Sequence, residues 1–176
     1  MNKKIVIYPG TFDPMHMGHL DIIERASRIF DEVIIAIAVN IDKNPLFNIQ
    51  ERINLASDAT SHLNNIKTLS TDGLIADFAK EHNASALIRG LRHVSDFEFE
   101  FQMATMNNHL NPDVSTLLMV TSDKYVHINS SMVKNVSKLK GDIAKYVPPN
   151  VLSALKSKFN YFLDSFYRLL KVAFSF

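Results

Sequence analysis

Apolar residues along this chain fall into short runs separated by segments in which they recur every three or four positions. Five short, mainly apolar runs at residues 5–7, 33–39, 66–69, 86–88 and 115–120 predict strands. Helical spacing follows the first run, with apolar residues at Ile22, Ile23, Ala26, Ile29 and Phe30. The run at 33–39 is apolar at every position, which is typical of a strand in a parallel sheet covered on both faces.

Strands and helices alternate five times in this pattern. The alternation predicts an α/β fold, a doubly wound (Rossmann-like) five-stranded parallel sheet with helices on both faces. Asn48 and Glu51 resemble a capping box, and so do Ser95 and Glu98. Further helices are expected from Leu74 to about His82, from Ser130 to an end at Gly141, and from Asn150 onward.

The segment from Phe97 to Phe101 alternates with period two, so it fits a strand as well as a helix. The apolar pattern continues to Leu110, and this length favours a helix. Its aromatic residues exceed what one helix face needs, so some can pack against another subunit. Glu98 and Glu100 are expected to face solvent.

The length of 176 residues suits a single domain, which we expect to span 1–159, and no internal repeat or low-complexity linker divides it. The tail 160–176 carries phenylalanines at helical spacing and predicts an amphipathic helix, too short and too charged to span a bilayer. Three interpretations of the tail remain open: contact with the same protein, binding to a membrane surface, and partial disorder. Its few lysines and arginines favour contact with the same protein.

Composition narrows the function classes. The net charge is only +1, so no global basic field predicts a nucleic-acid partner. Cysteine is absent, which excludes disulfides, thiolate nucleophiles and cysteine-based zinc sites. The first apolar run stops at Pro9 and Gly10, too early for a signal peptide. We therefore expect a cytoplasmic protein with no transmembrane segment.

The first candidate site is the stretch from Tyr8 to His19, a tight turn between a strand and a helix. The helix start offers free amides and the positive end of a dipole, and Gly10 and Gly18 allow a close approach to a ligand. His16 and His19 lie three residues apart and can direct donors at one phosphate. They are alternatively two capping or solvated histidines, or with Asp13 or Asp21 half of a metal site.

The second candidate site is a pair of arginines, Arg89 and Arg92, expected in a loop at the carboxyl end of the strand 86–88. Ligands bind at that edge of an open α/β sheet, and guanidinium groups bind phosphate oxygens in bidentate fashion. The alternative is two solvated loop arginines. Lys43, in the polar loop 40–47, is either an ordinary solvated lysine or a cation near the same edge.

The glycine, threonine and histidine signature of residues 8–19 resembles the nucleotidyltransferase superfamily. Four blocks together resemble the bacterial phosphopantetheine adenylyltransferases, over residues 3 to 158. The blocks are Tyr8 to His19, Lys43 to Phe47, Ile88 to Arg92 and Tyr125 to Ser131. The resemblance implies an enzyme of coenzyme A synthesis that joins ATP and 4′-phosphopantetheine into dephospho-coenzyme A and pyrophosphate, with Mg²⁺ held mainly through the ATP phosphates.

The resemblance also implies residue roles. His19 would stabilise the transition state, and the acceptor phosphopantetheine would contact Thr11, Lys43, Ile75 and Arg89. ATP would contact Thr11, Phe12, His19, Gly90, Leu91, Arg92, Glu100, Tyr125, Val126, His127, Ile128, Asn129, Ser130 and Ser131. It further implies a homohexamer, with coenzyme A as a candidate inhibitor.

These roles are consistent with the chemistry of in-line attack by an ionised phosphate. The reaction needs the charge of the two polyanions and of the transition state to be neutralised, and it needs no enzyme nucleophile and no strong base. The family commonly has serine where this chain has Asn129, and the tail 160–176 has no recognised counterpart. Two alternatives remain. One is a nucleotidyltransferase that uses another phosphorylated acceptor, which Lys43 and the block around Arg89 disfavour. The other is a nucleotide-binding module without catalytic activity.

Overall fold

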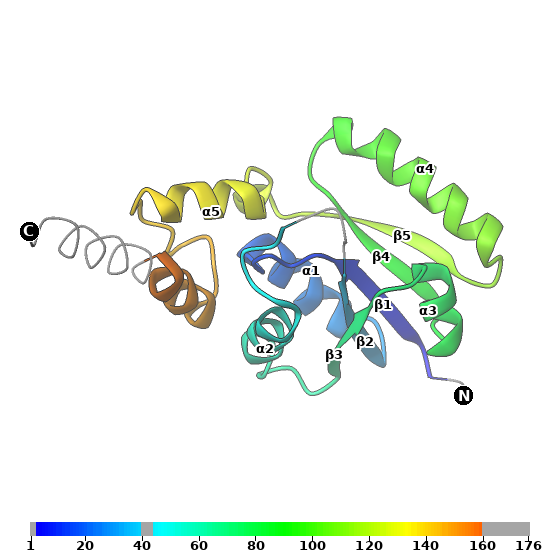
Figure 1. Ribbon diagram of the computed structural model, residues 1–176. Coiled ribbons are helices and arrows are strands. Elements are labelled where there is room, and N and C mark those ends of the chain that lie inside the picture. The colour runs from blue at the N-terminus through cyan, green and yellow to red at the C-terminus, as the bar shows by residue number, and fades with distance from the viewer. Residues whose placement is uncertain (1–2, 40–43, 160–176) are drawn as a thin grey trace, which may run out of the picture.

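The computed structural model describes residues 3–39 and 44–159, so Lys43 and the predicted helix of the tail 160–176 lie outside the described residues. Its sheet has five parallel strands in the order β3-β2-β1-β4-β5 (Figure 1). The strands are β1 (Ile5–Gly10), β2 (Glu32–Ala38), β3 (Ile66–Thr71), β4 (Ala86–Leu91) and β5 (Ser115–Val120). The doubly wound prediction is confirmed.

Among the described residues, the helices α1 to α5 and a short 3-10 helix connect or follow the strands. They are α1 (Met17–Ser27), α2 (Ile49–Ala59), α3 (Ile75–Glu81), α4 (Val94–Leu110), η1 (Asp123–Tyr125) and α5 (Ser130–Lys138). Residues 149–159 are also helical and lie beside α5 (Figure 1). Within the described ranges, no helix combines the length and the apolar character needed to cross a membrane.

Alternating side chains of the central strands build two cores, one on each face of the sheet. On β1, Val6 and Tyr8 pack into a core with residues of α1, α2, α5 and the helix 149–159. Ile7 points to the opposite face and packs with Phe78 and Ala79 of α3. Both faces of β1 are therefore covered, as the uninterrupted apolar runs predict.

Three strands run further than the sequence predicts, and β3 is one of them, since Ser70 and Thr71 pair with Ile37 and Ala38 of β2. β1 continues to Gly10 because residues 8–10 pair with residues 35–37 of β2. β4 continues to Leu91, pairing with β5 up to Val120, so Arg89 lies on a strand and not in a loop. The candidate site residues at these ends are thus placed by backbone pairing.

Predicted helix ends are partly wrong. The capping box of Asn48 and Glu51 is confirmed by hydrogen bonds of 2.9 and 2.7 Å in the two directions. In contrast, α4 begins one residue before Ser95, and its cap residue His93 makes no side-chain capping bond. α1 ends at Ser27, so Ile29 lies beyond the helix with 65% of its surface exposed.

The end of α5 also differs from the prediction. Lys140, not Gly141, takes the left-handed conformation that ends the helix, with φ of 61°. Gly141 follows it and donates its N–H to the carbonyl of Val136 at 2.9 Å. A Cβ at Gly141 would lie 2.5 Å from Val136 Cγ1, so close packing explains the glycine.

Candidate active site

The site lies where β1 and β4 are neighbours at the centre of the sheet. The strand order reverses between them, because β2 and β3 continue the sheet on one side and β5 on the other. Chains leaving the carboxyl ends of two such strands diverge and leave a crevice, the usual ligand position in this architecture. His16 and His19 follow β1, Arg89 lies on β4 and Arg92 comes directly after it, so the two candidate sites of the sequence form one site.

His16 and His19 form a stacked pair at the start of α1. Their ring centres are 3.7 Å apart, with 22° between the planes. The backbone N–H of His16 donates to Nδ1 of His19 at 3.3 Å. Because Nδ1 accepts this bond, a neutral His19 carries its proton on Nε2 and is a donor there.

His19 is held in its neutral form by its surroundings. Burial lowers the pKa of His19 well below its ordinary value, and His16, Arg92 and Arg89 lower it further. A neutral imidazole donor needs no change of protonation to meet an anion at pH 7. His19 is thus suited to donate a hydrogen bond and unsuited to act as an acid with a pKa near neutrality.

His16 is the cap residue of α1 and is only 4% exposed. Within the part of the chain that the structure describes, its Nδ1 is buried without a hydrogen-bond partner. Burial, with a smaller effect of Arg92, lowers the pKa of His16 from 6.5 to about 3. Protonation of this buried ring would place an unpaired charge in the protein interior, so its burial has a cost at low pH.

We expect His16 to make the protein acid-sensitive. Its folded pKa lies below its unfolded pKa, so the unfolded chain binds more protons between pH 6.5 and about 3. Stability from this group is complete above pH 6.5 and is lost as the pH falls through that window. Between pH 7.5 and pH 5 the free energy of unfolding should fall about 2 kcal/mol more in the wild type than in His16→Asn. Urea titrations at both pH values measure this, and equal losses in the two proteins would contradict it.

Two cavities meet at His19. The first has a volume of about 190 Å³, and Arg89, Arg92 and Glu100 line it with Tyr8, His16 and Thr121. The second has a volume of about 390 Å³, and its lining includes Thr11, Asp13, Pro45, Ser131 and Lys134. Phe12, His19 and Ser130 line both. His19 therefore stands between two spaces that both contain cationic side chains.

In the first cavity, Arg89 and Glu100 form a bidentate ion pair. Arg89 Nε and Nη2 donate to the Glu100 carboxylate at 2.7 and 2.8 Å, and Nη1 donates to the carbonyl of Pro9 at 3.0 Å. Burial alone lowers the pKa of Arg89, but its hydrogen bonds with Glu100 outweigh burial and raise the pKa. The expectation that Glu100 faces solvent is wrong, since it is 8% exposed.

Arg92 makes fewer hydrogen bonds to protein groups than Arg89. Its Nε donates to Asp96 at 3.3 Å, one turn along α4, and its side chain is 36% exposed. A partly exposed guanidinium with one weak partner can turn to a ligand at small cost.

In the second cavity, Asp13 connects three parts of the chain. Its carboxylate accepts the N–H groups of Leu46 and Phe47 at 3.0 and 2.9 Å and the ammonium of Lys134 at 2.6 Å. Sequence reasoning did not identify Lys134. The available signal was its spacing, because Lys134 lies four residues after Ser130 and so on the same face of α5.

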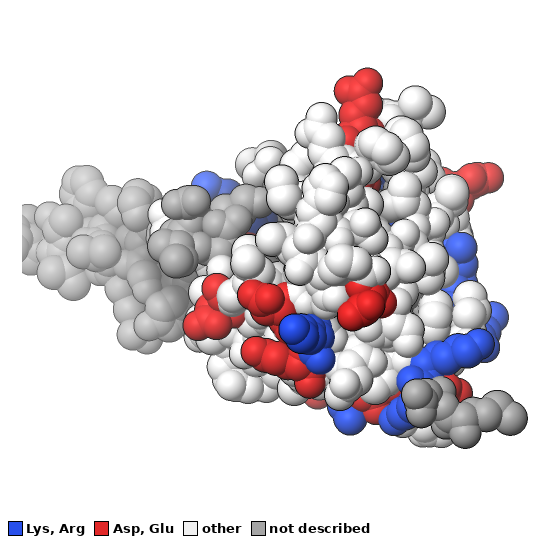
Figure 2. All heavy atoms as spheres, turned by 90° about the vertical axis from the view of Figure 1, so that its right-hand side faces the viewer, with Lys and Arg blue, Asp and Glu red and all other residues white. Residues whose placement is uncertain are grey.

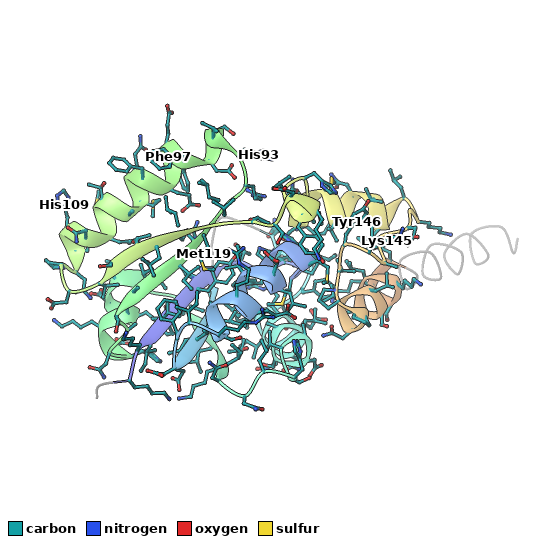
Figure 3. The ribbon with its side chains drawn as sticks, turned by 180° about the vertical axis from the view of Figure 1, so that it is seen from behind. His93, Phe97, His109, Met119, Lys145 and Tyr146 are labelled. Carbon is teal, nitrogen blue, oxygen red and sulfur yellow. The ribbon has the colours of Figure 1, made fainter. Side chains whose placement is uncertain are left out.

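The starts of α1 and α5 differ in the groups that they leave to a ligand. At α5 the Asn129 side chain accepts the N–H of Met132 at 2.8 Å, so the amide that replaces the family's serine caps the helix. The hydroxyl of Ser130 donates to the carbonyl of Pro14 at 2.9 Å. At α1 the N–H of Met17 is already bonded to the carbonyl of Tyr146 at 2.9 Å, so it is not available to a ligand. Figure 3 shows Tyr146 in the segment that follows α5.

Most sequence-predicted site residues meet at these cavities. Those that line one or both are Thr11, Phe12, His19, Arg89, Gly90, Arg92, Glu100, Asn129, Ser130 and Ser131. Ile75, Leu91, Tyr125, Val126, His127 and Ile128 line neither. Ile128 is fully buried in the apolar core, and Ile75 packs against the core on the other face of the sheet.

The chain is similar to known proteins in sequence and in fold. A family model described as cytidylyltransferase-like matches residues 7–136. A phosphopantetheine adenylyltransferase of Clostridium botulinum (strain Eklund 17B, type B) is 51% identical over 150 residues, which are 85% of this chain and 94% of that protein. The protein of the same name from strain Alaska E43 (type E3) is 50% identical over the same shares.

A solved structure shares the fold. It is a Vibrio parahaemolyticus protein described as a nicotinate-nucleotide adenylyltransferase, with a TM-score of 0.65 and 20% sequence identity. The match covers 88% of this chain and 91% of that one.

Proposed function

The chain belongs to the phosphopantetheine adenylyltransferases of the cytidylyltransferase-like family, and we propose that it transfers the adenylyl group of ATP to 4′-phosphopantetheine by direct in-line attack. A phosphate oxygen of the acceptor forms a bond to the α-phosphorus, and the bond from that phosphorus to the bridging oxygen breaks. Pyrophosphate leaves with the electron pair, and dephospho-coenzyme A remains. No covalent enzyme intermediate is formed.

The observation that carries this proposal is the position of His19 as a neutral donor between two cation-lined cavities. In-line displacement brings two polyanions together and develops negative charge on the equatorial oxygens. His19 Nε2–H is a fixed donor for that charge, and a fixed donor costs no reorganisation during the reaction. The transition state is therefore stabilised more than the bound substrates.

Cations and amides complete the site. We assign Arg89 to the acceptor phosphate and Arg92 to ATP, as the family resemblance implies, and add Lys134 as a cation for phosphates in the second cavity. Among the described residues, the N–H groups of Ser130 and Ser131 have no backbone partner and lie at the positive end of α5. The acceptor phosphate is ionised at neutral pH, so the reaction needs no strong base.

We propose that Mg²⁺ enters this site bound mainly to the ATP phosphates. Among the described residues, no cluster of three or more histidine, aspartate or glutamate side chains could hold a metal ion. The two carboxylates in the cavities already accept protein donors, Asp13 from Lys134 and Glu100 from Arg89. Mg²⁺ bound to ATP would supply further neutralisation of phosphate charge.

The acceptor is tested by pyrophosphate release from Mg-ATP. We expect release with 4′-phosphopantetheine and at least 10²-fold slower release with nicotinamide mononucleotide or phosphocholine, since binding energy specific to the acceptor is used in the transition state. Faster turnover of either alternative acceptor would assign another reaction. ATP binding without turnover of any acceptor would indicate a silent nucleotide-binding module.

We also propose a cytoplasmic homohexamer in which coenzyme A competes with the substrates. Large exposed apolar side chains support the assembly, because they concentrate on α4 and β5. They are Val94, Phe97, Phe99, Phe101, Met103, Met106, Leu110, Leu117 and Val120. Figure 2 shows few charged side chains over the upper part of the molecule, where α4 lies, and Figure 3 shows Phe97 on α4 and Met119 on β5. Sedimentation should find a smaller assembly for Phe101→Glu than for the control Leu139→Glu, and an unchanged hexamer would exclude this face.

A further inference from the structure

Asp21 lies on α1, two residues after His19, and holds the beginning of the loop that leads to α5. Its Oδ1 accepts the hydroxyl of Ser122 at 2.6 Å. Its Oδ2 accepts the N–H of Ser122 at 3.3 Å and Arg25 Nη1 at 3.2 Å. The same Arg25 nitrogen donates to the carbonyl of Val120 at 2.7 Å. The helix that carries His19 is thus fastened to the end of β5.

The fastened loop carries groups of both cavities. Thr121 lines the first cavity, and Ser130, at the other end of the loop, lines both. The Ser130 hydroxyl bonds to the carbonyl of Pro14, so the loop is held at both ends. Between them, Tyr125 lies close to the start of α1, 3.6 Å from where a Cβ at Gly18 would be.

Asp21 is well suited to fix this loop. Its side chain is only 14% exposed, so water competes weakly for its bonds. Burial alone raises the pKa of Asp21, but the hydrogen bonds from Ser122 and Arg25 outweigh burial and lower it. Asp21 is therefore a carboxylate at neutral pH, and hydrogen bonds to a charged acceptor are the stronger kind. It lines neither cavity, so it does not act on substrates itself.

We propose that Asp21 and Ser122 form a latch that positions the loop 121–129 and the start of α5 for ATP. The family resemblance assigns residues 125–131 to ATP, and ATP is a substrate in the proposed function, so this inference rests on that function. Asp21 is a positioning residue, because it acts through Ser122 on groups that contact the nucleotide. Breaking the latch should weaken ATP binding and leave 4′-phosphopantetheine binding unchanged.

Asp21→Asn tests the latch specifically, because both carboxylate oxygens of Asp21 accept hydrogen bonds. An asparagine of the same size replaces one oxygen by an NH₂ group, which faces a donor and cannot accept. Ser122→Ala removes the hydroxyl from the other side and leaves Asp21 in place. Ser122→Thr keeps the hydroxyl and is the conservative variant. Glu24→Gln is the matched control, since Glu24 lies on the same helix and pairs with His62 at 3.0 Å, away from the loop.

Calorimetry with ATP alone, and separately with 4′-phosphopantetheine alone, tests the latch. We expect Asp21→Asn and Ser122→Ala each to weaken ATP binding about tenfold, with the double variant close to the worse single variant because both remove one interaction. Ser122→Thr and Glu24→Gln should bind ATP like the wild type. Acceptor affinity should be unchanged in all five proteins.

Two outcomes would overturn the latch. One is unchanged ATP affinity in both single variants. The other is an equal loss of affinity for both ligands, which would show a general structural role. Failure of the proposed function is a separate result, namely wild-type protein that releases no pyrophosphate with 4′-phosphopantetheine. In that case the ATP affinities of the variants still decide whether the latch positions the nucleotide loop.

Discussion

Replacing His19 with alanine is expected to lower kcat by a factor of about 10² to 10³ while leaving the protein folded. In the proposed mechanism the Nε2–H of His19 donates to charge that is present mainly in the transition state, so its loss should affect kcat more than substrate binding. The ring also packs against Phe12, with centres 4.9 Å apart, but truncation at a cavity wall leaves space that water can fill.

Two further variants make this result specific. His19→Gln restores an N–H donor at a similar distance from the backbone and should recover part of the lost kcat. His62→Ala removes a half-exposed histidine that pairs with Glu24 and should leave kcat unchanged. A folded His19→Ala enzyme that keeps most of the wild-type kcat would remove His19 from the mechanism.

Arg89→Ala is expected to weaken 4′-phosphopantetheine binding about 10- to 100-fold and to change ATP affinity much less. A charged hydrogen bond contributes about 1.5–3 kcal/mol, which corresponds to that range. Arg92→Ala should show the opposite preference, because Arg92 is assigned to ATP. Calorimetry with each ligand on both variants gives the comparison, and a reversed pattern would exchange the two assignments.

The variant at Arg89 needs a folding control because Glu100 is buried beside it. Removing the guanidinium leaves a buried carboxylate without its cation, which costs about 3–5 kcal/mol in such sites. Arg89→Lys keeps a positive charge for Glu100 but loses the planar fork, so it should fold better and bind the acceptor with intermediate affinity. Lys43→Ala is predicted to act in the same direction as Arg89→Ala, although Lys43 lies outside the described residues.

The fold was largely predictable from the sequence because its signals are local. Strand-length apolar runs, helical spacing and the alternation of the two determine a doubly wound sheet with few alternatives. The capping box at Asn48 was readable because its two partners are three residues apart. The ends of the strands could not be predicted from the sequence, because pairing with neighbouring strands extends β1 and β4.

The candidate site was predictable where a motif carries it and unpredictable where distant residues meet. The stretch from Tyr8 to His19, and Arg89 and Arg92 at the end of β4, were identified from short segments. Glu100 was misjudged because its partner Arg89 is on another element. The Asp13 to Lys134 pair spans 121 positions, so no local pattern connects it. The pairs Arg89–Glu100 and Asp13–Lys134 could not be predicted because their members lie on different elements, and not because of their residue types.

The most direct measurement of the central claim is the stereochemistry at the α-phosphorus. ATP that carries sulfur at one diastereotopic α-phosphate oxygen has a defined configuration there, which the dephospho-coenzyme A analogue retains or inverts. A single in-line displacement past His19, with no covalent enzyme intermediate, predicts inversion. Retention of configuration would show two successive displacements through an enzyme-bound adenylyl group and would contradict direct transfer between the two substrates.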